Sequence, residues 1–179
     1  MAATLTAMVR QQSRVLAGTT IGVLAMLAVV SYPLLTGEGP LSGPPLWLVG
    51  VQLAAGLLLH LVLEAVGYRA AAVPPGTPEE EVHRIAVAAF QSRTLLRIAA
   101  AESIGVVSLA VAFVLGGGGV WTGYVTGAAV SVALIGVHGW PWSRPIDRTE
   151  AALQRDGTRV GLREAFGLPP RRTGAVQEL

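Results

Sequence analysis

The chain has 179 residues, of which 52% are hydrophobic and 13% charged, and its formal net charge is +2. This composition is more apolar than that of a soluble domain, and the small positive charge gives no reason to expect a nucleic-acid partner. The absence of cysteine excludes disulfides, thiol catalysis and cysteine-ligated metals.

Long apolar segments without charge predict membrane spans, because a helix needs about 20 apolar residues to cross the hydrocarbon core. A Gly- and Pro-rich segment, 36–45, ends the first span, and four glycines at 116–119 predict a tight hairpin between the last two. The sequence therefore predicts an all-α fold, a bundle of four transmembrane helices. We place the spans at about 15–35, 46–66, 98–115 and 120–137.

The segment before the third span predicts an amphipathic helix that continues into it. Thr77 and Glu80 match a capping box, and Pro78 suits a first helical turn. We expect one helix from Pro78 to Leu115, amphipathic at the cytoplasmic surface before it enters lipid. Its apolar face would consist of Val82, Ile85, Ala86, Ala89 and Phe90.

The polar C-terminal segment predicts a second unit. Residues 1–142 would form the membrane domain and residues 143–179 a cytoplasmic tail. A short helix is expected over 145–155, and Asp156-Gly157 would end it.

The arginines predict the orientation of the chain. Every arginine lies before the first span, between the second and third, or after the fourth. Positive residues near span ends are retained in the cytoplasm, so both termini are expected there, in a multi-pass protein of the cell inner (plasma) membrane. The absence of lysine and asparagine is typical of a GC-rich bacterial genome.

Small residues at intervals of four predict close helix contacts, because they let two backbones approach. Packing inside one bundle is the first interpretation, and a seam with a second copy or with a partner membrane protein is the alternative. The residues concerned are Gly119, Gly123, Gly127 and Ser131 in the fourth span, with Gly18 and Gly22 in the first.

Ionisable residues inside the spans are the candidates for function, because a charge at bilayer depth is unfavourable without a partner. From the helical rise, Glu64, Arg97 and His138 lie within about 5 Å of the inner end, and His60 and Glu102 lie about 10 Å inside. These five residues form the candidate intramembrane polar cluster. We expect Arg97 to extend to the headgroups, and Glu64 to pair with it or with water. Glu102 is expected either to be protonated or to hydrogen-bond to His60.

Motifs for catalysis are absent from the sequence. It contains no nucleophile elbow, P-loop or dinucleotide fingerprint, so an enzyme is the less favoured class. Histidine and glutamate are suitable metal ligands, but the sequence contains no H-E-x-x-H and no pair of E-x-x-H motifs of the di-iron type. We therefore expect no metal site and no cofactor.

One segment resembles a known pattern. Phe90–Glu102, together with Trp140-Pro141, is similar to small four-helix bacterial integral membrane proteins of unassigned function. The resemblance covers roughly the second half of the chain. It implies a membrane bundle and brings no activity with it.

Three functional interpretations follow. A noncatalytic accessory, assembly or structural membrane component is favoured, with the lipid bilayer and a second copy or another membrane protein as partners. The alternative is a small proton-coupled transporter or channel using Glu102, His60 and Glu64. A membrane enzyme acting on a lipid-like substrate at the same cluster is the second alternative.

Overall fold

The computed structural model describes residues 2–37, 42–116 and 118–169. All regular structure in these ranges is helical, which confirms the predicted all-α class. Gly117 of the predicted hairpin and residues 170–179 of the predicted tail lie outside the described residues. The elements are α1 (Ala2–Thr36), α2 (Leu46–Val66), α3 (Glu79–Leu115), α4 (Gly118–Leu134), the π-helical turn η1 (Ile135–Gly139), α5 (Ser143–Leu153) and α6 (Leu162–Ala165).

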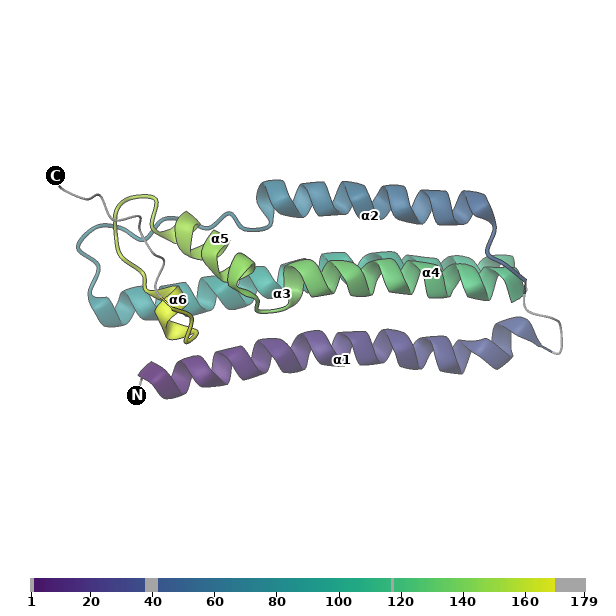
Figure 1. Ribbon diagram of the computed structural model, residues 1–179, viewed down its shortest axis with the longest axis horizontal. Helices are drawn as coiled ribbons and strands as arrows, with labels where there is room; N and C mark the ends of the chain where they lie inside the picture. The colour runs from purple at the N-terminus through teal and green to yellow at the C-terminus, as the bar shows by residue number, and fades with distance from the viewer. Residues whose placement is uncertain (1, 38–41, 117, 170–179) are drawn as a thin grey trace.

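Four long helices lie side by side along the long axis of the molecule, and α4 contacts each of the other three (Figure 1). All four are long and apolar enough to cross a membrane. Large apolar side chains on their outer faces are exposed, which is unfavourable in water and favourable in lipid. The chain is therefore a multi-pass membrane protein. On α2 the exposed set includes Leu46, Trp47, Val51, Leu57, Leu58 and Leu61.

The predicted long helix is present as α3, but its capping box is not. The N-cap position belongs to Pro78, and no side chain caps the helix. Thr77 therefore lies one residue too early to cap, and its Oγ1 donates to the Pro74 carbonyl at 2.7 Å instead. The capping prediction was wrong because the proline occupies the boundary residue rather than the first turn.

The small residues of α4 lie where it meets neighbours within the same chain. A Cβ atom added to Gly123 would lie 2.5 Å from Cδ2 of Leu48 on α2. One added to Gly127 would overlap Oγ of Ser108 on α3. A Cβ atom added to Gly119 would lie 2.8 Å from Oγ of Ser42. This face of α4 can approach both helices only because it carries no side chains.

Ser131 continues this face, whereas the small residues of α1 do not pack against the bundle. The Oγ of Ser131 accepts a hydrogen bond from the backbone N–H of Gly105 on α3, at 2.8 Å. Around Gly18 and Gly22, in contrast, an added Cβ would meet nothing within 4 Å. Both glycines lie on the exposed face of α1, so packing through them within the chain was a wrong prediction.

The tail folds back onto the helical extension of α3. The rings of Phe90 on α3 and Phe166 after α6 lie 4.8 Å apart, in a core that the tail helices share with α3. The apolar face of the extension was expected to lie at the cytoplasmic surface, but the tail covers much of it. The buried residues are Val9, Val73, Val82, Ala86, Val87, Phe90, Ile146, Leu153, Val160, Leu162 and Phe166. We call the end of the bundle that carries α5 and α6 the tail end.

A widened turn ends α4. The backbone N–H of Trp140 donates to the carbonyl of Ile135 at 2.9 Å, five residues back, as in a π-helix. Pro141 then stops the helix because it has no N–H. The Gly136 carbonyl accepts a hydrogen bond from the indole Nε1 of Trp142 at 2.8 Å. This termination places η1 against α3 and α1, with the His138 side chain next to His60 of α2.

Candidate functional site

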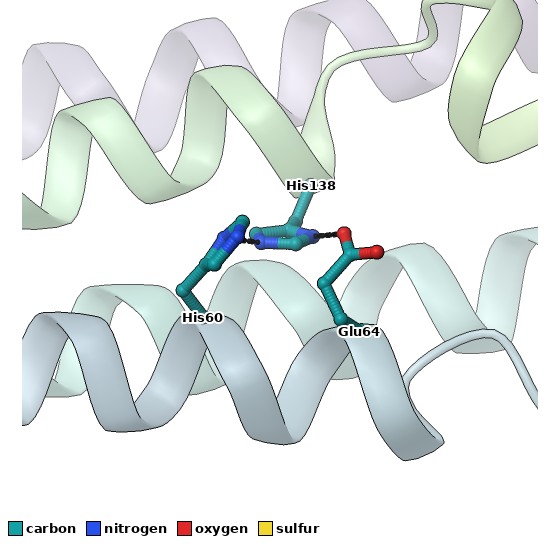
Figure 2. A group of neighbouring side chains, drawn as sticks. All are labelled: His60, Glu64 and His138. Atoms are coloured by element: carbon teal, nitrogen blue, oxygen red, sulfur yellow. Dashed lines mark hydrogen bonds and ion pairs between the residues drawn. The ribbon is translucent and has the colours of Figure 1, made fainter.

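His138, in η1, lies at the centre of a group of polar side chains at the tail end. It is fully buried, and both ring nitrogens have partners on or just after α2. Its Nε2 lies 2.9 Å from Nδ1 of His60, and its Nδ1 lies 2.8 Å from the phenol oxygen of Tyr68. Oε1 of Glu64 is 3.8 Å from the same Nδ1. Figure 2 shows the His138 ring between His60 and Glu64.

The spacing of these partners follows from the helix. His60 and Glu64 are four residues apart and share one face of α2. Tyr68 comes four residues later, just beyond the end of the helix at Val66. The helical rise predicts His60 about 5 Å deeper than His138, and the structure brings their rings into direct contact across that difference.

Arg97 is fully buried and binds backbone carbonyls rather than headgroups. Its Nε donates to the His138 carbonyl at 2.8 Å, and its Nη1 donates to the Gly67 carbonyl at 3.2 Å. Nη2 donates to Oγ1 of Thr94 at 2.9 Å, and Cζ lies 4.6 Å from the centroid of the Tyr68 ring. The expectation that Arg97 extends to the headgroups was wrong. Carbonyls at helix C-termini lack helical donors, and they attract a guanidinium.

Glu64 pairs with arginines of α5, not with Arg97. Its Oε2 lies 2.9 Å from Nη2 of Arg144 and 3.1 Å from Nη2 of Arg148. Its Oε1 is buried and has no hydrogen-bond partner among the described residues. The carboxylate therefore ties α2 to the tail.

Glu102 does not join this group, which corrects the expected pairing with His60. It is half-buried on α3, and no hydrogen bond or ion pair engages it within the described ranges. His60 contacts His138 instead. The inner face of α3 carries Ala101, and Glu102 is rotated from it by about 100° around the helix. Equal depth in two spans did not imply contact.

Four members of the group were not predicted: Tyr68, Thr94, Arg144 and Arg148. A signal for Tyr68 exists, because positions 60, 64 and 68 continue one row at intervals of four. Arg144 and Arg148 are also four apart on α5, but no sequence pattern shows that the tail returns to Glu64. We refer to His60, Glu64, Tyr68, Arg97 and His138 as the polar clamp.

The hydrogen-bonded chain through His138 can run in either direction. Burial raises the pKa of the Tyr68 phenol, and the positive charge of Arg97 offsets part of that rise. A neutral phenol can donate to Nδ1 of His138, whose Nε2 then donates to Nδ1 of His60. Reversing every donor gives an equally complete chain, with His60 as donor. The clamp is therefore a continuous path of titratable groups over a short distance.

Three clamp residues are also a potential set of metal ligands, although the sequence predicts no metal site. One ligand atom each of His60, Glu64 and His138 lies within 4.8 Å of the others. However, His60 and Glu64 contact opposite nitrogens of the His138 ring (Figure 2). An ion bound by all three would have to replace a hydrogen bond that His138 makes to His60 or Tyr68. The adjacent Arg97 and the two arginines on Glu64 also oppose a cation, so the arrangement fits a hydrogen-bonded chain better.

On the side of the clamp away from the tail end, the bundle is closely packed. A Cβ atom added to Gly56 would lie 2.6 Å from Cγ1 of Val130, so α2 and α4 are in direct contact one turn from His60. Further along α2, the Nε2 of Gln52 donates to Oγ of Ser108 and to the Gly123 carbonyl, both at 2.9 Å. This amide joins three helices. The contact at Gly56 separates it from the clamp.

Comparisons with models of protein families, with curated proteins and with solved structures found no match. The function is therefore inferred from this chain's own residues.

Proposed function

We propose that this protein is a noncatalytic membrane component, accessory or structural in role, whose second, third and fourth spans are tied together at the tail end by the polar clamp. The observation that carries this proposal is the saturation of His138. Both of its ring nitrogens and its carbonyl oxygen contact groups of other elements, and the residue is fully buried. A side chain engaged in this way holds helices together and has no free atom for a substrate.

The other clamp residues support the same interpretation. Arg97 uses three nitrogens on His138, Gly67 and Thr94, and the first two lie outside its own helix. Glu64 joins α2 to α5 through Arg144. Buried polar groups of this kind favour one arrangement of helices, because any other arrangement leaves them unpaired in an apolar medium.

The arginine distribution supports an orientation with the tail end in the cytoplasm. Reporter fusions after Trp142 should report a cytoplasmic position, and fusions in the 116–119 hairpin an external one. An external signal after Trp142 would overturn the orientation without affecting the fold.

A proton-coupled transporter is the second candidate, and the continuous chain His60–His138–Tyr68 is the observation that favours it. Proton transfer requires an unbroken series of groups that can both accept and donate a proton. Such a path would have to open the contact between Gly56 and Val130. The close packing at that point makes this candidate the less favoured one.

Proton flux into liposomes separates the two candidates. With a potential imposed across the membrane, vesicles carrying the protein should acidify no faster than protein-free vesicles. His60→Ala should then lower the unfolding temperature and leave the flux at background. A flux above background that His60→Ala and Glu64→Gln abolish, while Glu79→Gln retains it, would overturn the structural proposal in favour of transport.

A further inference from the structure

A second polar site lies at the tail end and shares no residue with the polar clamp. A pocket of about 980 Å³ opens between the N-terminal part of α1, the start of α3 and the segment around α6. Figure 1 shows α6 lying near this part of α1. Its volume is that of a small-molecule site, which encloses about 300–1,000 Å³. The charged and histidine side chains that line it are Arg10, Arg14, Glu79, His83, Arg159 and Glu164.

The pocket precedes the segments that are expected to cross the membrane. The first span is expected at about 15–35 and the third at about 98–115, and the lining residues of α1 and α3 all come before them. The remaining wall belongs to the tail, from Arg159 to Gly167. Arg14, Glu79 and Glu164 are exposed. We therefore expect the pocket to open to water, and its ligand to be a soluble molecule.

Two helices contribute polar side chains of different character to the pocket. Arg10 and Arg14 are four residues apart and share one face of α1, and Glu79 and His83 have the same spacing on α3. The wall that α1 forms is thus cationic, whereas the wall that α3 forms is not. In the third wall, the charge of Arg159 is already paired with Glu164, at 2.5 Å.

Both helices carry nitrogen atoms whose binding capacity is unused within the chain. Arg14 forms no hydrogen bond or ion pair with any residue that the structure describes. Nη1 of Arg10 makes one long hydrogen bond, to the Phe166 carbonyl at 3.3 Å. Nε2 of His83 is buried and has no hydrogen-bond partner in the described ranges. A buried nitrogen without a partner is unfavourable and uncommon, so a ligand that pairs with it binds more tightly.

The chemistry of the two walls defines a class of ligand. Guanidinium groups bind the oxygens of a phosphate through charge-assisted hydrogen bonds. A carboxylate accepts hydrogen bonds from hydroxyl groups, and a hydroxyl suits Nε2 of His83 in either tautomer because it both donates and accepts. Glu79 also repels a second anionic group. A ligand that fits both walls therefore has one phosphate and several hydroxyl groups.

We propose that this pocket binds a soluble phosphorylated polyol of the sugar phosphate class. The phosphate lies against Arg10 and Arg14, and the hydroxyl groups lie against Glu79 and His83. Arg159 stays paired with Glu164 and closes the pocket on the α6 side. The bound molecule joins α1 to α3 and the tail, at a place that the polar clamp does not reach.

Isothermal titration calorimetry on the full chain tests the proposal. The protein is purified in an amine-oxide detergent, whose headgroup carries neither phosphate nor sugar. It is titrated at constant ionic strength with glucose 6-phosphate, glucose or inorganic phosphate. We expect glucose 6-phosphate to bind more tightly than inorganic phosphate, and glucose to show no binding. Arg14→Gln should weaken glucose 6-phosphate binding about tenfold, since one charge-assisted contact is lost, and Arg14→Lys should restore part of it.

His83→Ala distinguishes the two ends of the ligand. It should weaken glucose 6-phosphate binding about fivefold, because one hydrogen bond is lost, and leave the binding of inorganic phosphate unchanged. Equal effects on the two ligands would overturn the placement of the hydroxyl groups against α3.

Arg155 supplies the matched control. It follows α5, is exposed, and lies outside the pocket. Arg155→Gln should bind glucose 6-phosphate like the unmodified protein, and circular dichroism checks that all variants stay folded. Equal losses in the Arg14 and Arg155 variants, or no binding of glucose 6-phosphate to the unmodified protein, would overturn the proposal. If inorganic phosphate bound as tightly as glucose 6-phosphate, the site would be assigned to free phosphate and not to a sugar phosphate.

Discussion

Nδ1 of His60 and Nε2 of His138 lie 2.9 Å apart, although 78 positions separate the residues in the chain. The contact joins α2 to the end of α4 and connects, through His138, to Tyr68 and the backbone that Arg97 binds. The strength of this contact can be measured by mutation, because both partners are side chains.

A double-mutant cycle should detect coupling between the two histidines. His60→Ala and His138→Ala should each lower the free energy of unfolding, since each leaves a buried polar partner unpaired. The double variant should lose less free energy of unfolding than the two single variants added together, by about 0.5–3 kcal/mol. His83 lies near the start of α3, away from the clamp, so His60→Ala and His83→Ala should be additive. Denaturant titration in detergent measures both cycles, and additivity in the first would contradict the clamp.

Replacing Arg97 should be among the most destabilising substitutions in this protein. Arg97→Leu leaves the carbonyls of Gly67 and His138 without their donor, and we expect a loss of about 2–5 kcal/mol. Arg84 offers a control, because it is exposed and its one ion pair among the described residues is with Glu81, one turn away. Arg84→Leu should change the free energy of unfolding by less than about 1 kcal/mol. Similar losses for the two variants would indicate that the buried contacts of Arg97 contribute little.

Gly127 and Gly22 should respond oppositely to the same substitution. Gly127→Ala places a methyl group where Ser108 Oγ lies, so thermal unfolding should occur at lower temperature. Gly22→Ala meets nothing within 4 Å and removes a flexible residue from a helix, so stability should hold or rise slightly. If Gly22→Ala instead lowers stability or changes the oligomer size, the exposed face of α1 contacts a second copy or another protein.

Glu102 should tolerate loss of its carboxyl group. No other described residue bonds to it, and Glu102→Leu replaces a polar group on a helix in lipid with an apolar one. Unfolding temperature should therefore stay the same or increase. Glu64→Leu is the informative comparison, because it removes the partner of Arg144 and Arg148 and should lower that temperature. A marked loss of stability in Glu102→Leu would reveal a partner in another chain.

Zinc should leave the clamp unaffected. His60 and Glu64 face opposite nitrogens of His138, and nearby arginines oppose a cation. Neither zinc nor EDTA should shift the unfolding temperature. A zinc-dependent increase that disappears in both His60→Ala and Glu64→Ala would show that these residues bind metal.

The sequence by itself determined the class of the fold and the course of its helices. The second span was expected at 46–66 and α2 occupies Leu46–Val66, because Pro45 and Gly67 bound an apolar segment of the length that lipid requires. The continuous helix from the surface into the third span was likewise expected. These features depend on local composition, which can be read directly from the sequence.

Only the tertiary structure decided which polar groups meet. Depth along a helix can be counted from the rise per residue, but the direction in which a side chain points depends on how each helix is rotated against its neighbours. For this reason Glu102 was assigned to His60, which in fact contacts His138. The sequence does not reveal the partners of Arg97, because they are backbone carbonyls. These carbonyls lack a helical donor only because α2 and η1 end beside Arg97. The return of α5 to Glu64 depends on a tail that buries apolar residues against α3, a long-range packing that no local pattern encodes.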